Sequence, residues 1–100
     1  MYTKEEVSHF VYGSHVIDLN KRMVFNNGIE VKLTSKEFDV LDFFLKRRQK
    51  AVSRDEILNV VWGEDYFGTD RVVDDTIRRL RKKMGDFNIE TIYGYGYRHL

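Results

Sequence analysis

The chain has 100 residues, of which 42% are hydrophobic and 33% charged, so it can build one compact domain with a buried core. It contains no cysteine, which excludes disulfides, thiolate catalysis and cysteine-ligated zinc. No apolar run approaches the roughly 18 residues of a membrane span, and the first residues lack the apolar stretch of a signal peptide, so we expect a cytoplasmic protein.

Residues 1–8 are polar, and we interpret them as a disordered end or the remnant of a linker. From residue 10 to residue 33, short apolar runs alternate with turn signals. Asn27-Gly28 indicates a hairpin, because both central positions of such a turn need positive φ. Ile29, Val31 and Leu33 alternate with charged residues, which predicts one buried and one solvated face. The segment predicts an antiparallel sheet of three or four strands.

Two capping boxes then predict two helices. Thr34-x-x-Glu37 opens the first, which we expect to end near residues 46–48. Ser53-x-x-Glu56 opens a shorter second helix that Gly63 ends. The apolar faces of these helices consist of Phe38, Leu41, Phe44 and Leu45 in the first, and of Ile57, Leu58 and Val61 in the second.

A third helix is predicted from about Asp70 to Met84, capped by Asp70 or Thr69 and ended by Gly85. Its apolar residues form a narrow stripe at helical spacing: Val73, Ile77, Leu80 and Met84. Residues 86–100 then read as a hairpin whose turn contains two glycines. The fold class is therefore α+β, a winged helix-turn-helix with an N-terminal antiparallel sheet, three helices and a C-terminal β-hairpin wing, as a single domain over residues 1–100.

Positive charge is concentrated on the third helix. Residues 71–83 hold six cations against Asp74 and Asp75, an excess of four, although the whole chain carries a net charge of only +1. A helical wheel places Arg71, Asp75, Arg78 and Lys82 opposite the apolar stripe, with Arg79 beside them. Such a face fits the major groove of DNA, where Arg donates two hydrogen bonds to guanine. The alternative is an ordinary solvated helix face.

Other candidate contacts flank this helix. Tyr93 and Tyr95, near the hairpin turn, either touch DNA or cover the core edge, whereas Tyr97 is expected in the core. Trp62 is either a core residue or a donor to phosphate through its indole N–H. The three histidines lack metal-ligand spacing, and no nucleophile elbow or phosphate loop is present. We therefore expect neither an enzyme nor a bound cofactor or metal.

Several motifs together resemble the effector domain of OmpR/PhoB-type response regulators, from about His15 to Leu100. The motifs are Leu33-Thr34-Ser35-Lys36-Glu37-Phe38, Val52-Ser53-Arg54-Asp55-Glu56-Ile57-Leu58, Val61-Trp62-Gly63, Asp70-Arg71-Val72-Val73-Asp74, Ile77-Arg78-Arg79-Leu80-Arg81-Lys82-Lys83 and Gly94-Tyr95-Gly96-Tyr97-Arg98. The resemblance implies binding to promoter DNA, usually as a head-to-tail homodimer on direct repeats. It also implies an upstream receiver domain, absent here, that a sensor histidine kinase phosphorylates.

The resemblance further implies roles for individual residues. The loop after the second helix would face RNA polymerase, and it consists of Gly63, Glu64, Asp65, Tyr66, Phe67, Gly68 and Thr69. The DNA-contacting residues carried over by position are Arg54, Trp62, Arg71, Thr76, Arg78, Arg79, Arg81, Thr91, Tyr93, Gly94, Tyr95 and Gly96; Asp75 and Lys82 join them from the helical wheel. Two positions depart from similar proteins: Tyr93 stands where an Arg is frequent, and Asp75 where an aliphatic residue is frequent.

Two alternatives to DNA recognition stay open. One is a winged helix used for protein–protein contact without sequence-specific DNA binding. The other is a small structural or RNA-associated domain. A DNA-binding domain, unlike these two alternatives, predicts binding to duplex DNA that weakens steeply with salt, because phosphate contacts release counterions.

Overall fold

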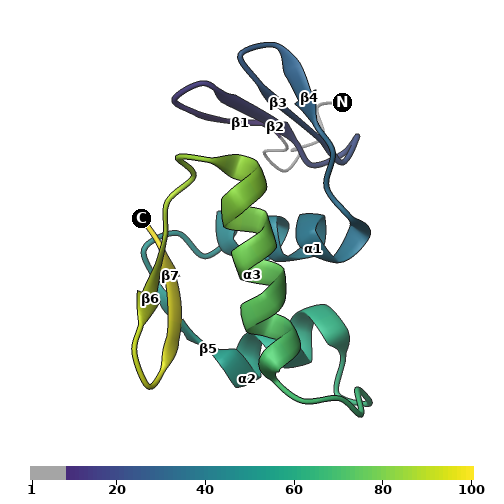
Figure 1. The fold of residues 1–100 in the computed structure, drawn as a ribbon, viewed down its shortest axis with the longest axis vertical. Helices are drawn as coiled ribbons and strands as arrows, with labels where there is room; N and C mark the ends of the chain where they lie inside the picture. The colour runs from purple at the N-terminus through teal and green to yellow at the C-terminus, as the bar shows by residue number, and fades with distance from the viewer. Residues whose placement is uncertain (1–8) are drawn as a thin grey trace, which may run out of the picture. The chain divides into compact units, whose positions relative to one another are not determined.

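The computed structural model describes residues 9–100, which form two compact units (Figure 1). One unit ends at Lys32 and the other spans Leu33–Leu100. The larger one contains every candidate contact residue that the sequence predicts.

The first unit is a four-stranded antiparallel meander in the order β1-β2-β3-β4. Its strands are β1 (His9–Tyr12), β2 (His15–Asp18), β3 (Met23–Asn26) and β4 (Ile29–Val31). The turn between β3 and β4 has φ 52° at Asn27 and 80° at Gly28, which confirms the predicted hairpin. The predicted burial of Ile29 is wrong, since its side chain is 74% exposed. It pairs with Asn26 beside the turn, at the end of the sheet, where solvent reaches it.

In the second unit, α1 (Ser35–Leu45) begins at the predicted capping box. The Thr34 hydroxyl accepts the backbone N–H of Glu37 at 3.2 Å, and a Glu37 carboxylate oxygen accepts the N–H of Thr34 at 2.9 Å. These bonds satisfy two N–H groups that a helix start leaves without partners. The apolar face is buried as predicted: Phe38, Leu41, Phe44 and Leu45.

The second helical segment is less regular than predicted. It consists of α2 (Arg54–Ile57) and a π-helical turn, η1 (Leu58–Trp62), that ends at Gly63 with φ 96°. The Ser53 hydroxyl accepts the N–H of Glu56, but the Glu56 carboxylate lies 3.6 Å from Arg47 Nε. Only one of the two hydrogen bonds of a capping box is therefore present.

The third helix, α3 (Arg71–Met84), has the predicted bounds to within one residue, and Gly85 follows it with φ 66°. The stripe formed by Val73, Ile77, Leu80 and Met84 is fully buried, as predicted. The predicted side-chain cap is wrong. Asp70 already has helical φ and ψ and makes no capping hydrogen bond, and the carbonyls of Thr69 and Asp70 accept the first N–H groups.

Three short strands complete the unit in the order β5-β7-β6, all antiparallel. They are β5 (Ala51–Ser53), β6 (Ile89–Ile92) and β7 (Gly96–His99), and β5 was not predicted from the sequence. Only Gly94, with φ 77°, belongs to the β6–β7 turn. Gly96 begins β7, and a Cβ there would overlap the carbonyl oxygen of Val52. The second glycine therefore allows β7 to approach β5 rather than forming the turn.

Candidate nucleic-acid interface

The outer face of α3 is exposed along its length. Arg71, Asp75, Arg78 and Lys82 are all exposed, on the side opposite the buried stripe. Arg78 is 73% exposed and lies 3.6 Å from Asp75, one helical turn away. An ion pair of this kind is weak and readily exchanged for another anion, so Arg78 can reach a base or phosphate. This confirms the exposure that the helical wheel predicts for these four residues.

Two cations on the flank of α3, Arg79 and Lys83, bind a buried carboxylate of the protein itself. Glu37 of α1 is fully buried, and its carboxylate lies 2.6 Å from Lys83 Nζ and 3.4 Å from Arg79 Nε. Burial alone would raise the pKa of Glu37, but the bonds from Lys83 and Thr34 and the charges of Lys83 and Arg79 outweigh it and lower that pKa. The ionised carboxylate therefore fastens α1 to α3.

Two residues carried over by resemblance are not free to face DNA. Thr76 is only 1% exposed, because it lies next to the buried stripe, and its hydroxyl accepts a hydrogen bond from Arg79 at 3.4 Å. Arg81 donates two hydrogen bonds to the carbonyl of Ile89, at 3.0 and 2.7 Å, and one to the hydroxyl of Thr91 at 2.9 Å. Arg81 thus ties β6 to α3, and Thr91 is its partner.

Asp74, which is not among the predicted contact residues, joins three elements. Its Oδ1 accepts hydrogen bonds from Arg54 Nε of α2 at 3.0 Å and from the Tyr97 hydroxyl of β7. Burial and the neighbouring carboxylate raise the pKa of Tyr97 to about 12, so its hydroxyl stays protonated and donates. The buried ring confirms that Tyr97 is a core residue. Arg54, still 45% exposed, is held beside α3.

The β6–β7 hairpin lies beside α3, with its turn at the end where α3 begins (Figure 1). Tyr93 and Tyr95 are 92% and 50% exposed at this turn, on either side of Gly94. The backbone N–H of Arg54 donates to the carbonyl of Tyr95 at 3.4 Å. The turn is therefore adjacent to Arg54 and to the first half of α3.

The loop between η1 and α3 exposes an aromatic side chain. Phe67 is fully exposed, whereas Tyr66 is half-buried with its ring 6.4 Å from that of Trp62. Trp62 is also half-buried, and Lys36 Nζ lies 5.7 Å from its ring centre. Trp62 therefore packs against its neighbours on one side and stays accessible on the other.

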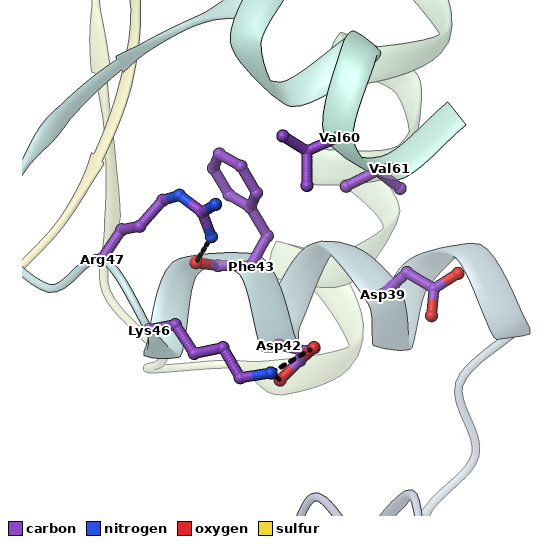
Figure 2. A pocket seen from close by; sticks show the side chains of 7 residues that line it. All are labelled: Asp39, Asp42, Phe43, Lys46, Arg47, Val60 and Val61. Carbon is purple, nitrogen blue, oxygen red and sulfur yellow. Dashed lines mark hydrogen bonds and ion pairs between the residues drawn. The ribbon is translucent and has the colours of Figure 1, made fainter. Parts of the chain in front are cut away.

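A hollow of about 400 Å³ lies between α1 and η1 (Figure 2). It is lined by Asp39, Asp42, Phe43, Lys46, Arg47, Val60 and Val61. Figure 2 shows Lys46 reaching Asp42 and Arg47 reaching the carbonyl of Phe43, so these charged groups bind within the chain. None of the predicted contact residues lines the hollow.

Within residues 9–100, no group of three or more acidic or histidine residues is arranged to hold a metal ion. No helix in this range has the length and apolar character needed to cross a membrane.

Residues 28–99 match the protein family described as "Transcriptional regulatory protein, C terminal". The chain belongs to this family. Its fold is the winged helix of OmpR/PhoB-type DNA-binding effector domains, as the sequence motifs predict. CssR of Bacillus subtilis, a transcriptional regulatory protein, is 60% identical over 72 residues, which are 72% of this chain and 32% of CssR.

Solved structures agree with this assignment. The DNA-binding domain of Bacillus subtilis CssR superposes with a TM-score of 0.79 at 50% identity, covering 93% of this chain and all of that domain. The RstA DNA-binding domain of Klebsiella pneumoniae, solved with the RstA box, gives a TM-score of 0.81 at 34% identity and covers 93% of this chain and 97% of that one. The chain spans only 32–44% of the length of the first curated relatives it matches.

Proposed function

We propose that this domain controls transcription by binding specific sequences in double-stranded promoter DNA, with α3 in the major groove. The observation that carries the proposal is the division of α3 into a fully buried stripe and an exposed outer face with Arg71, Arg78 and Lys82. An α-helix fits the major groove, and an arginine there reads guanine through two hydrogen bonds. Similarity to the RstA DNA-binding domain, which was solved in complex with the RstA box, supports DNA binding by this chain.

The surroundings of α3 suggest how the domain is held on the duplex. Arg54 is fixed by Asp74 beside α3 and is suited to bind a backbone phosphate. The hairpin turn lies next to Arg54 and would reach the flanking groove. Arg79 and Arg81 hold the protein together, so we assign them an indirect role.

Further partners follow from membership of the family and are part of the proposal. We propose binding as a homodimer on direct repeats, and control by a sensor histidine kinase through a receiver domain that lies outside these residues. The loop of residues 63–69, with Phe67 fully exposed, would contact RNA polymerase. The domain would act in the cytoplasm, by binding alone, without a cofactor and without catalysis.

The test starts from a library of genomic fragments or random duplexes, because the operator sequence is unknown. We expect the domain to enrich a restricted set of sequences and to bind them with an affinity that falls steeply with salt. If no duplex is preferred over bulk DNA at moderate salt, sequence-specific binding is refuted. A protein–protein module would give that outcome, and an RNA-associated domain would instead prefer RNA competitors.

The variant Arg78→Ala tests the role of the outer face. If Arg78 reads a base, its loss should cost about 1–3 kcal/mol on the selected duplex and relax the preference at one position. Arg48→Ala is the matched control, because it removes the same charge from an exposed residue outside the proposed interface. An equal loss on every duplex would instead mark Arg78 as a phosphate contact.

A further inference from the structure

α3 carries two carboxylates, Asp74 and Asp75, and only the first of them binds other elements of the fold. Oδ1 of Asp74 accepts hydrogen bonds from Arg54 Nε at 3.0 Å and from the Tyr97 hydroxyl, so this charge is used within the protein. The side chain of Asp75 is 56% exposed on the outer face, 3.6 Å from Arg78. Asp75 therefore places a negative charge on the surface that we propose to face DNA.

A carboxylate at this place weakens binding to DNA unless it finds a hydrogen-bond donor, because the phosphates repel it. On the base edges of the major groove, the donors are the N4 amino group of cytosine and the N6 amino group of adenine. The adenine group lies beside N7, an acceptor that also repels a carboxylate, whereas cytosine presents no acceptor there. The chemistry of Asp75 is therefore matched to cytosine.

Arg78 supplies the complementary half of this recognition. An arginine donates to O6 and N7 of guanine. In a G·C pair, cytosine N4 and guanine O6 are hydrogen-bonded to each other, so the two atoms lie about 3 Å apart. Oδ1 of Asp75 and Nη2 of Arg78 are 3.6 Å apart, which is close to that spacing and too long for a hydrogen bond between the side chains. The two groups can therefore reach the two bases of one pair.

We propose that Asp75 and Arg78 together read one G·C base pair in a fixed orientation, with Asp75 accepting from cytosine N4 and Arg78 donating to guanine. This base readout rests on the proposed function and names a base pair that α3 selects. Asp75 contributes mainly by repelling the wrong bases. Thymine in place of cytosine presents the acceptor O4 to the carboxylate, and a reversed pair presents guanine O6 and N7.

Substitutions at Asp75 test the readout on the duplex that the wild-type domain selects and on that duplex with each base pair replaced in turn. Asp75→Ala should lower the preference for the G·C pair roughly tenfold, at the position that Arg78→Ala also relaxes. It should also tighten binding to bulk DNA roughly two- to fivefold, because a repelling charge is removed. Asp75→Asn should raise the affinity for adenine relative to cytosine at this position, because an amide donates to N7 and accepts from N6.

Asp65→Ala is the matched control, because it removes the same charge from an exposed residue of the loop 63–69, outside the proposed DNA contact, and should leave the base preference unchanged. Since Asp75 is 56% exposed, its variants should unfold at the wild-type urea concentration, so a lost contact is not confused with misfolding. The readout is refuted if no G·C pair is relaxed by both Asp75→Ala and Arg78→Ala, or if Asp75→Ala weakens binding to selected and bulk DNA alike. Failure of the proposed function itself would appear earlier, as a wild-type domain that selects no duplex.

Discussion

The two sides of α3 carry the same kinds of side chain and use them differently. On the outer face, Arg71, Arg78 and Lys82 extend into solvent. On the flank, Arg79 and Lys83 bind the buried carboxylate of Glu37, and Arg81 binds the backbone of β6. The run of cations on α3 therefore divides into two groups, and the partners of each cation decide to which group it belongs.

The difference has a consequence for measurements of DNA binding. On the proposed function, loss of an outer cation should remove a contact with DNA and leave the fold intact, whereas loss of a flank cation should disturb the fold that positions the outer face. Both reduce binding. Measurements of unfolding and of the salt dependence of binding, made together, separate the two cases.

The largest loss of stability is expected when the Glu37 carboxylate, which binds Arg79 and Lys83 on the flank of α3, is replaced. In Glu37→Gln the amide can still accept the N–H of Thr34, but the attraction to Lys83 and Arg79 is lost. We expect the free energy of unfolding to fall by about 2–3 kcal/mol, less than for a fully buried pair, because both cations are partly exposed and can hydrate. Urea denaturation measures this loss.

Asp42→Asn is the matched control for this change. It makes the same carboxylate-to-amide substitution on α1, at a residue paired with the exposed Lys46. The expected loss is at most about 0.5 kcal/mol. If the two variants lose equal stability, the buried carboxylate does not fasten α1 to α3.

The same group predicts how stability depends on pH. The pKa of Glu37 lies below its ordinary value of 4.5, so its contribution is fully present above pH 4.5 and is lost as the pH falls further. Burial also lowers the pKa of His99 from its ordinary value of 6.5, and this costs stability in a separate window that begins below pH 6.5. The Glu37→Gln variant should therefore show a weaker pH dependence than the wild type below pH 4.5 and the same dependence above it. Urea midpoints across both windows measure this.

Sequence patterns predict the regular parts of the fold because local rules govern them. The capping box at Thr34, the stripe on α3 and the Asn27-Gly28 turn each depend on spacing within a few residues. The strand β5 was missed because three residues are too few to show a period. The role of Gly96 was missed for the same reason, since its neighbour Val52 belongs to that strand.

The candidate interface likewise has a part that local spacing predicts and a part that depends on residues distant in sequence. The helical wheel correctly exposes the outer face of α3, because that face is opposite the core. Residues at the border between the two faces depend on partners that are distant in sequence, such as Glu37 for Lys83 and Tyr97 for Asp74. A wheel contains no information about such partners. The link from Asp74 to Arg54 and Tyr97 was therefore not found. Thr76, which the resemblance places at the DNA, is buried beside the apolar stripe.

The second largest loss of stability is expected from the hydrogen bonds that connect α3 to the β6–β7 hairpin. Arg81→Ala removes three hydrogen bonds to β6 and leaves the carbonyl of Ile89 without its charged donor. We expect a loss of about 2 kcal/mol in the free energy of unfolding, with faster hydrogen exchange in β6 and β7 than in α1. If the variant is as stable as the wild type, Arg81 is available to DNA and belongs with the outer face.

The smallest effect on stability is expected for a substitution at Lys82, the residue that follows Arg81. Lys82 is exposed on the outer face, so Lys82→Ala should change the free energy of unfolding by no more than about 0.5 kcal/mol. If Lys82 meets a phosphate, binding should weaken by a similar factor on every duplex, and the salt slope should fall by about one. Arg81→Ala and Lys82→Ala remove one cation each from adjacent positions, so any difference between them reflects the side of α3 and not the charge. A stable Lys82→Ala variant with an unchanged salt slope would remove Lys82 from the interface and leave Arg71 and Arg78 as its helical cations.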